Sequence, residues 1–441
     1  MQGHQNHWHI FRKGGFILSM QAHSYVSSGL IFRFLLSGLL LTGTFFFSPY
    51  IIIAIIMLMN CYCAYALRRN NIAFFAMAFI LFSNYSIFAY YWFDLFGSPI
   101  TNRYINWLEY PEVIQIGLMV LFVFSATLYC VLPSFADNEI HIYLVGEDKG
   151  KNPFMGLLFL IGIILIICVS IFLTYRSGVY TERTIYEYTT VLYILALYHI
   201  GHKKPLTYLL FGVMAVDILF ILVNGDRGHA LQLMLMVYCV FLHDKLPKWT
   251  LVLPLIIGII GMNAVGIWRG RGTFSVEVLA DSLTKLRERK FVLDTAYAAE
   301  GSGLGMVYLT NVYGFGERLR LFAVYILSIF VGTSALSPDA NLAAIVINEG
   351  LYASGGGVLP NYGYFYLGYF GVIALGLLVC FYISLMAKCT EKTSGLKQCI
   401  SVYLFSTITS WYLYSPAPLI RGVLLLSILY LFSTKIRIKL R

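Results

Sequence analysis

The chain has 441 residues, of which 59% are hydrophobic and only 12% are charged, and its mean hydropathy is +0.76. A soluble protein of this length needs far more polar surface, so the composition excludes an ordinary soluble enzyme. The formal net charge is +10. In a membrane protein such an excess reflects topology and attraction to anionic lipid, so it does not indicate a nucleic-acid partner.

Long apolar segments recur along the whole chain and predict an all-α polytopic membrane protein. Residues 152–173, for example, contain no charge. About 20 such residues cross a bilayer as a helix, because a helix satisfies its own backbone hydrogen bonds where lipid offers none. We predict about 12 membrane-spanning helices of this kind. They lie near residues 29–47, 49–67, 71–95, 112–132, 153–174, 186–200, 205–223, 228–243, 249–267, 361–387, 398–414 and 419–433.

A further apolar run, residues 319–335, is ambiguous, and the positive-inside rule decides how it is placed. If this run does not span, the helix ends that face one side carry most of the lysines, including Lys388, Lys392 and Lys397. If it spans, those three lysines move to the opposite side together with the basic C-terminus. We therefore expect 319–335 to lie against the membrane or over the bundle.

This topology divides the chain into five parts and places both termini in the cytoplasm. We expect no cleavable signal peptide, because the first long apolar run is a full span. We also expect no disulfides, because the cysteines fall in spans or at cytoplasmic ends. The parts are a cytoplasmic N-terminus (1–28), a bundle of about nine spans (29–267), a large periplasmic loop with amphipathic helices (268–360), about three further spans (361–433) and a basic cytoplasmic tail (434–441).

Arginine is concentrated on the outer face, where the positive-inside rule disfavours any cation. A guanidinium binds phosphate through two parallel hydrogen bonds, whereas a lysine ammonium acts as a point charge. The pattern therefore indicates an anionic ligand on this face, or else ordinary surface pairs with nearby carboxylates. The arginines predicted there are Arg103, Arg176, Arg183, Arg227, Arg269, Arg271, Arg287, Arg289, Arg318, Arg320 and Arg421.

The segment NGDRGHAL (224–231) leaves one predicted span and enters the next within a few residues. Arg227 then stands at the start of a helix, whose free amides and dipole also attract an anion. Asp226 offers the alternative, because it could pair with Arg227 or cap the helix.

Two more arginine positions adjoin span ends. In GIWRGRG (266–272), Arg269 and Arg271 follow a predicted span directly. In SPAPLIRG (415–422), Arg421 precedes the last predicted span. The alternative to ligand binding is that these side chains snorkel or anchor a helix at the membrane surface.

The predicted outer loop carries further candidates. Residues 277–298 fit an amphipathic helix on which Arg287 could contact a substrate, although such charge clusters are usually solvated. Glu300 is a candidate general base or the ion-pair partner of a loop arginine, and His229 is a second candidate base. The glycine-rich stretch 336–361 is too flexible to be a span.

Tyrosines gather in or beside the same loop. Tyr352, Tyr362 and Tyr364 could stack on the faces of sugars. The aromatic belt at membrane interfaces accounts for many such residues, so both explanations stay open.

At these residues the sequence resembles O-antigen polymerases of the Wzy type, within the oligosaccharide repeat unit polymerase family. That family combines about a dozen spans, a large periplasmic loop in the C-terminal half and a short Gly-x-Arg turn between two spans. Gly225-Asp226-Arg227-Gly228 matches the turn, and YGYFYLGYFGVIALG (362–376) resembles the glycine-punctuated segment after the loop, with Tyr364, Gly368 and Gly371 in the usual pattern. The acidic residue often found beside that segment is missing. The likeness covers about 224–387.

The resemblance implies a glycosyltransferase of the bacterial inner membrane that joins undecaprenyl-diphosphate-linked oligosaccharide repeat units. These lipid-linked units, membrane lipid and a chain-length regulator protein are the implied partners, and we expect no metal or other cofactor. Arginines would stabilise the departing diphosphate. The candidate catalytic residues are Arg227, Glu300 and His229, the candidate diphosphate ligands are Arg227, Arg269, Arg271, Arg287 and Arg421, and the candidate sugar contacts are Tyr352, Tyr362 and Tyr364.

Two other functions compete with polymerisation. An O-antigen ligase shares the spans, the outer loop and the lipid-diphosphate donor, and differs in its acceptor. A flippase for lipid-linked oligosaccharides would carry charges inside the bundle and little mass outside it. Charges within the predicted spans are few, with Asp217 and Arg33 the clearest, and no internal repeat is evident, so we favour the polymerase.

Overall fold

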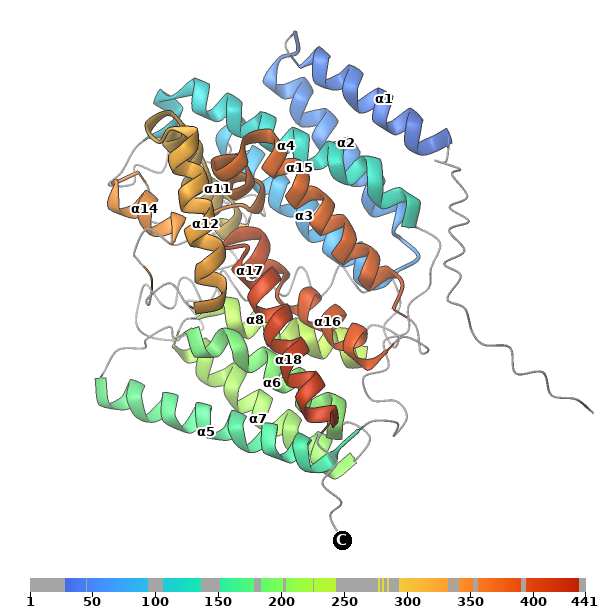
Figure 1. Cartoon of the computed structure of the whole chain (residues 1–441), viewed down its shortest axis with the longest axis vertical. Coiled ribbons are helices and arrows are strands. Elements are labelled where there is room, and N and C mark those ends of the chain that lie inside the picture. The colour runs from blue at the N-terminus through green and yellow to red at the C-terminus, as the bar shows by residue number, and fades with distance from the viewer. Residues whose placement is uncertain are drawn as a thin grey trace, which may run out of the picture.

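The computed structural model is all-helical over the residues that it describes (Figure 1). Most helices form two packed groups, and the remaining helices cover one end of the bundle. The described residues are 28–44, 46–93, 106–135, 151–177, 184–200, 204–224, 226–242, 277, 280, 284, 293–331, 336, 341–351, 356–389 and 394–435.

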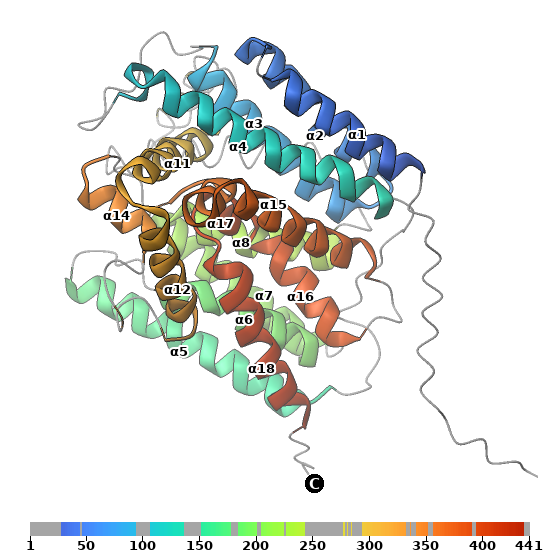
Figure 2. The ribbon, with the colours of Figure 1, turned by 45° about the horizontal axis from the view of Figure 1, so that its top comes forward.

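The first group contains four N-terminal helices and one long C-terminal helix. Within it α2 packs on α3 and α4, α1 packs on α4, and α15 runs along α4 (Figure 2). Proline occupies the first turn of α2, α4 and α15, where its missing N–H costs no helical hydrogen bond. The helices are α1 (Ser28–Gly43), α2 (Pro49–Ala66), α3 (Asn71–Tyr91), α4 (Pro111–Val131) and α15 (Leu359–Ala387).

The second group is built on α5 and α6, which pack together, and on α7 and α8, which form a second pair. Helix α16 lies between these pairs and α18, and it also contacts α15, which joins the two groups. A π-helical turn extends α8 and another one leads into α18. The helices are α5 (Pro153–Ser177), α6 (Thr184–Ile200), α7 (Lys204–Val223), α8 (Arg227–Val237), α16 (Gly395–Ser406) and α18 (Val423–Lys435), with the π turns at Tyr238–Leu242 and Pro418–Gly422 (η6).

Helices α11, α12 and α14 lie on the left of the bundle in Figure 1, and α17 lies near its middle. Helix α11 packs on α3, α4 and α15, α14 packs on α11, and α12 contacts α15 and η6. Helix α17 inserts between α11 and α8. The helices are α11 (Asp294–Val312), α12 (Phe315–Val331), α14 (Leu342–Asn348) and α17 (Ile408–Leu413).

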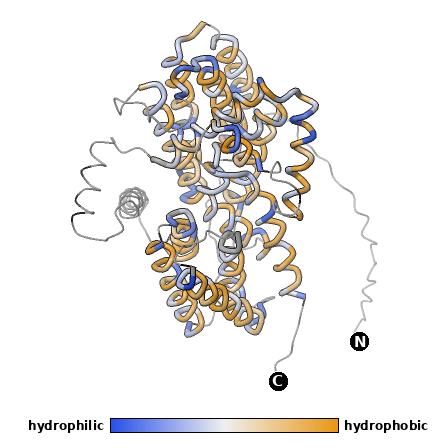
Figure 3. Tube along the Cα trace, turned by 90° about the vertical axis from the view of Figure 1, so that its left-hand side faces the viewer, coloured by the Kyte–Doolittle hydropathy of each residue, from blue (hydrophilic) through white to orange (hydrophobic). Residues whose placement is uncertain are grey.

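Among the described residues, seven helices are long and apolar enough to cross a membrane, and the chain is a multi-pass membrane protein. Large apolar side chains are exposed on several of them, such as Leu158, Leu165 and Phe172 on α5, and hydrophobic residues occur along most of the described trace (Figure 3). Apolar surface of this extent suits contact with lipid. The seven segments are Pro49–Ala66, Asn71–Tyr91, Pro111–Ser134, Pro153–Arg176, Lys204–Val223, Leu359–Ala387 and Pro418–Lys435.

Eleven of the twelve predicted spans coincide with helices, although not all of these are full-length spans. Helices α1, α6 and α8 are apolar but shorter. The predicted span 398–414 consists of two short helices, α16 and α17, separated at Thr407. The predicted span 249–267 lies outside the described residues. The described part of the ambiguous run 319–335 ends at Val331 and lies in α12, which is not among the seven candidate spans.

Contacts between helix ends show that the segments cross the bundle in alternating directions. At one end Asn70 Nδ2 donates to the Ala387 carbonyl at 3.4 Å, and His199 Nε2 lies 2.9 Å from Ser433 Oγ. We call this the basic end, because Arg68 lies shortly before Asn70 in the chain, and Lys388 and Lys435 lie shortly after Ala387 and Ser433. The opposite end, where α11, α12 and α14 lie, is the loop end. Among the described residues, Arg68, Lys388 and Lys435 thus lie at one end of the bundle, and the side of the membrane that this end faces stays a prediction.

Helix α15 is broken at Gly368, whose φ of 62° is in the region that favours glycine. Its two halves cross where a Cβ at Gly371 would lie 2.1 Å from the Gly363 carbonyl oxygen, so both positions need glycine. A break leaves carbonyls of the preceding turn without helical donors. Arg318 Nη1 donates to one of them, the Phe365 carbonyl, at 3.0 Å. The straight span predicted at 361–387 is thus two helical pieces.

The topology can be tested by cysteine labelling on both sides of α12. We expect Asn311→Cys and Asn348→Cys, both at exposed positions, to react with a membrane-impermeant maleimide added outside intact cells. The control Ser394→Cys, exposed at the basic end, should react only after the membrane is permeabilised. Labelling of only one of the first pair from outside would mean that α12 spans the membrane.

Candidate functional site

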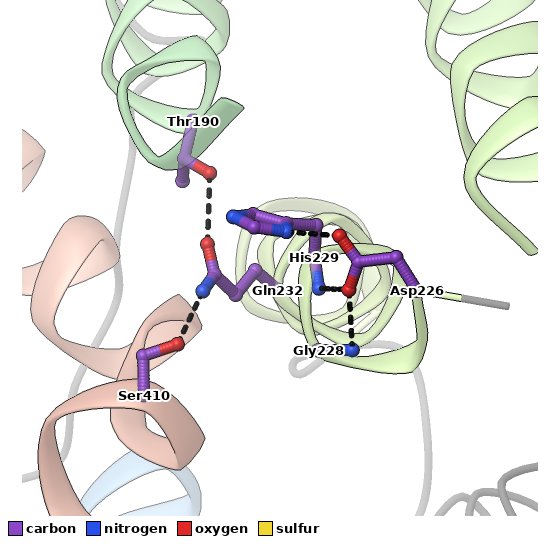
Figure 4. Close-up of polar contacts among 6 residues, drawn as sticks. All are labelled: Thr190, Asp226, Gly228, His229, Gln232 and Ser410. Atoms are coloured by element: carbon purple, nitrogen blue, oxygen red, sulfur yellow. Dashed lines mark hydrogen bonds and ion pairs between the residues drawn. The ribbon is translucent and has the colours of Figure 1, made fainter. Parts of the chain in front are cut away.

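The turn between α7 and α8 is closed by Asp226, the N-cap residue of α8 (Figure 4). Its Oδ1 accepts hydrogen bonds from the backbone N–H groups of Gly228 at 3.1 Å and His229 at 3.3 Å. Capping, one of the two roles foreseen for Asp226, is therefore what the structure shows. The sequence predicts that free amides at this helix start attract an anion. In the structure the amides of Gly228 and His229 are bonded to the Asp226 carboxylate instead.

The second carboxylate oxygen of Asp226 bonds to Nδ1 of His229. Burial on its own raises the pKa of Asp226, but the His229 ring and the two backbone amides outweigh it, so the pKa lies below its ordinary value. An ionised carboxylate only accepts, so Nδ1 carries the proton, and the lone pair of the ring in its neutral form lies on Nε2. No third His, Cys, Asp or Glu among the described residues joins this pair to form a metal site.

A buried glutamine continues the same face of α8. Gln232 accepts a hydrogen bond from Thr190 Oγ1 of α6 at 3.2 Å and donates to Ser410 Oγ of α17 (Figure 4). Asp226, His229 and Gln232 are spaced by three residues, which places them on one side of a helix. Gln232, Thr190 and Ser410 were not among the residues predicted from the sequence. The spacing of Gln232 after His229 in an otherwise apolar segment was the available signal.

Arg227 is the first residue of α8, so its backbone lies beside the Asp226–His229 pair. Its side chain lies outside the described part of the structure, as do Arg269, Arg271, Arg287, Tyr352 and most of the predicted amphipathic helix 277–298. The roles assigned to these residues stay predictions.

Arg421 ties three elements together. Its Nε donates to the Ile329 carbonyl at 2.8 Å, its Nη1 to the Tyr188 hydroxyl at 3.0 Å, and its Nη2 to the Ser328 carbonyl. Ser328 and Ile329 belong to the last turn of α12, whose carbonyls lack helical donors and whose dipole favours a cation. This geometry matches the anchoring role, and its assignment as a diphosphate ligand stays a prediction.

Glu300 lies on α11 and is completely buried, whereas the sequence analysis placed it in a loop beside arginines. Its Oε2 accepts a hydrogen bond from Asn361 Nδ2 at 2.8 Å. Glycine makes room for this pair, because a Cβ at Gly303 would lie 1.9 Å from Asn361 Nδ2 and one at Gly117 3.2 Å from Glu300 Oε1. Burial raises the pKa of Glu300 to about 8, and the Asn361 bond only partly offsets it. A carboxyl that keeps its proton at neutral pH is poorly placed to act as the base.

The two described tyrosines of the predicted sugar site differ in exposure. Tyr362 is 2% exposed, and its hydroxyl donates to the Tyr414 carbonyl at 2.6 Å, so its ring offers no open face. Tyr364 is half-buried, with its ring edge-on to Tyr369 at 5.1 Å. Tyr362 therefore contributes to packing, and we do not retain it as a sugar contact.

The cap predicts different costs for two substitutions of Asp226. Asp226→Ala removes both amide bonds and should lower the free energy of unfolding by about 0.5–2 kcal/mol. Asp226→Asn keeps an accepting oxygen and should lower it much less, although it weakens the bond to His229. Unfolding in mixed detergent micelles measures both. Equal destabilisation by the two substitutions would show that charge, and not capping, stabilises the turn.

The buried carboxyl predicts a pH dependence of stability. Folding raises the pKa of Glu300 from 4.5 to about 8, so between these values the unfolded chain binds fewer protons than the folded one. Stability should then fall as the pH rises through this window, by at most about 1.4 kcal/mol per pH unit. Glu300→Gln should remove that fall, whereas Glu317→Gln, at an exposed position on α12, should not. Parallel profiles for wild type and Glu300→Gln would contradict the assignment.

Comparison of the chain with known protein families, with curated proteins and with solved structures finds no match. Its function is therefore inferred from its own residues, above all from those at the α7–α8 turn.

Proposed function

We propose that this chain is a membrane glycosyltransferase that polymerises undecaprenyl-diphosphate-linked oligosaccharide repeat units at the outer face of the bacterial inner membrane. The observation that carries the proposal is the α7–α8 turn, where a buried carboxylate–histidine pair adjoins Arg227 at the start of a helix. Asp226 and Arg227 also belong to the Gly-x-Arg turn, Gly225-Asp226-Arg227-Gly228, on which the resemblance to Wzy-type polymerases rests. About 12 spans and an extracytoplasmic loop at 268–360 belong to this proposal.

In the proposed step a hydroxyl of the incoming unit attacks the anomeric carbon at the end of the growing chain. The new carbon–oxygen bond forms as the bond to the lipid diphosphate breaks, and the diphosphate leaves with the bonding electrons. His229, oriented by Asp226, accepts the proton of the hydroxyl. The Arg227 guanidinium stabilises the negative charge that develops on the diphosphate.

The cap formed by Asp226 makes the guanidinium more important in this mechanism. A helix start usually offers free amides to an anion, but here the amides of Gly228 and His229 are bonded to Asp226. A diphosphate at this turn then depends on a side chain for its counter-charge, and Arg227 is the basic residue of the turn.

The charged groups within the candidate spans favour a transferase over a carrier. Asp217 of α7 accepts a hydrogen bond from the Tyr193 hydroxyl of α6 at 3.0 Å. Arg33 of α1 donates to the Cys130 carbonyl and to Ser134 Oγ at the end of α4. Both side chains join neighbouring elements of the protein, which is how structural polar groups are held in a bundle.

Substitution of the turn residues tests the proposal. With purified protein and lipid-linked repeat units, Arg227→Lys should slow polymerisation about 10²-fold or more, since an ammonium cannot hold two phosphate oxygens at once. His229→Gln should cost about 10²–10⁴-fold. Arg320→Lys is the matched control, because Arg320 is an exposed arginine of α12 paired with Glu317, and it should keep full activity.

Full activity of both turn variants, at normal protein levels, would exclude the proposed site. The lipopolysaccharide of a deletion strain separates the competing functions. Loss of a polymerase leaves one repeat unit on the core, loss of a ligase leaves none, and loss of a flippase stops assembly.

A further inference from the structure

A groove of about 630 Å³ opens on the surface of the first group between α1, α2 and α4. Leu36 and Leu40 line it from α1, and Ile55 and Met59 line it from α2. Met59 is buried, whereas Leu58 on the rim is exposed, so the groove is open to the outside of the bundle. Its volume lies within the range of about 300–1,000 Å³ typical of sites for small molecules.

The polar side chains of the groove gather at one of its ends. Tyr62 and Tyr65 lie in the last two turns of α2, and Tyr129 lies in the last turn of α4. The rings of Tyr62 and Tyr129 meet edge-to-face with centroids 5.3 Å apart. Because α2 and α4 both finish at the basic end, the groove is apolar in its middle and amphipathic at that end.

Two arginines flank the amphipathic end. The Arg68 guanidinium stacks on the Tyr65 ring, 3.9 Å from its centroid. Arg33 lies one turn before Leu36 on α1 and donates to the Cys130 carbonyl at 3.2 Å and to Ser134 Oγ at 2.9 Å. A guanidinium has five N–H donors, so these bonds leave further donors for a phosphate.

Helices α2 and α4 are candidate membrane spans, and α1 is a shorter apolar helix beside them. The apolar part of the groove therefore lies at the depth of the hydrocarbon layer, where lipid chains are the available apolar molecules. We infer that the groove binds an acyl chain of an anionic membrane phospholipid, whose phosphate head group is held by Arg33 and Arg68. Tyrosines at the same end suit the level of lipid head groups.

The position of the head-group end separates this lipid from the substrate of the proposed transferase. The groove ends at the basic end, whereas the turn with Asp226 and His229 follows the opposite end of α7. A lipid diphosphate bound in the groove would hold its phosphates on the wrong side of the bundle for the proposed step. The inference does not depend on the proposed function, and an anionic phospholipid fits the lysines and arginines of that end.

Native mass spectrometry of the purified full chain tests the inference. We expect phosphatidylglycerol to be retained at lower concentration than phosphatidylcholine with the same acyl chains. Arg33→Gln and Arg68→Gln should each weaken retention of phosphatidylglycerol about fivefold and leave phosphatidylcholine unchanged. Arg176→Gln, at an exposed arginine at the end of α5, should change neither.

Filling the groove should abolish retention of the lipid. Leu36→Trp places a large side chain in the groove, and Leu158→Trp places the same side chain on the exposed face of α5 as a control. A second approach avoids changes to the packing. Cys61 is an exposed thiol in the groove lining and Cys168 an exposed thiol of α5. A maleimide on Cys61, in a Cys168→Ala background, should displace the lipid, and the converse label should not.

Three results would overturn the inference. They are equal retention of the two phospholipids, retention that is insensitive to both Leu36→Trp and the label on Cys61, and tighter retention of undecaprenyl phosphate than of phosphatidylglycerol. The last result would make the groove a substrate site, and none of the three bears on the activity of the Arg227 and His229 variants.

Discussion

The hydrocarbon layer offers no hydrogen-bonding groups, so each polar side chain within this bundle needs a partner from the protein itself. Asn60 of α2 donates to Ser125 of α4, and the Tyr412 hydroxyl of α17 donates to Asn84 of α3. Such bonds join segments far apart in the chain, as the pairing of residues 84 and 412 shows. Polar residues in the spans thereby select which helices become neighbours, a choice that apolar packing against lipid leaves open.

The α7–α8 turn differs from these isolated polar pairs, because several polar side chains gather there. Asp226, His229 and Gln232 give an otherwise apolar helix one polar face. Asp226 and His229 bond to each other and Gln232 bonds to Thr190, so the three do not share a single opposing residue. Several ionisable and amide groups gathered at a helix start cost desolvation that a structural pair would avoid. Where the rest of a sequence agrees with its fold, a local cluster of costly polar groups is typical of a functional site.

The positions of helices could be read from the sequence, because apolar runs of about 20 residues specify them directly. The arrangement around Glu300 could not, since it depends on Asn361, 61 residues later, and on space left by Gly117. The break in α15 could be predicted only in part. The glycines of 362–376 indicate an irregular segment, but only the structure shows that the chain turns at Gly368. The boundary at Thr407 had no glycine or proline to mark it. At the α7–α8 turn, Asp226 and His229 were found because they lie three residues apart in one short motif, whereas Thr190 and Ser410 come from other helices.

The arginines predicted on the outer face include two whose role the structure shows. Arg318 and Arg421 donate to backbone carbonyls, one at the break in α15 and the other at the end of α12. A planar fork with several donors suits this task, because carbonyls at a helix end stand close together and need more than one N–H. Structural demand therefore accounts for part of the arginine preference without any ligand. Binding of an anion by the other arginines stays a prediction, and the position beside a carboxylate–histidine pair is what distinguishes Arg227 from the arginines that close helix ends.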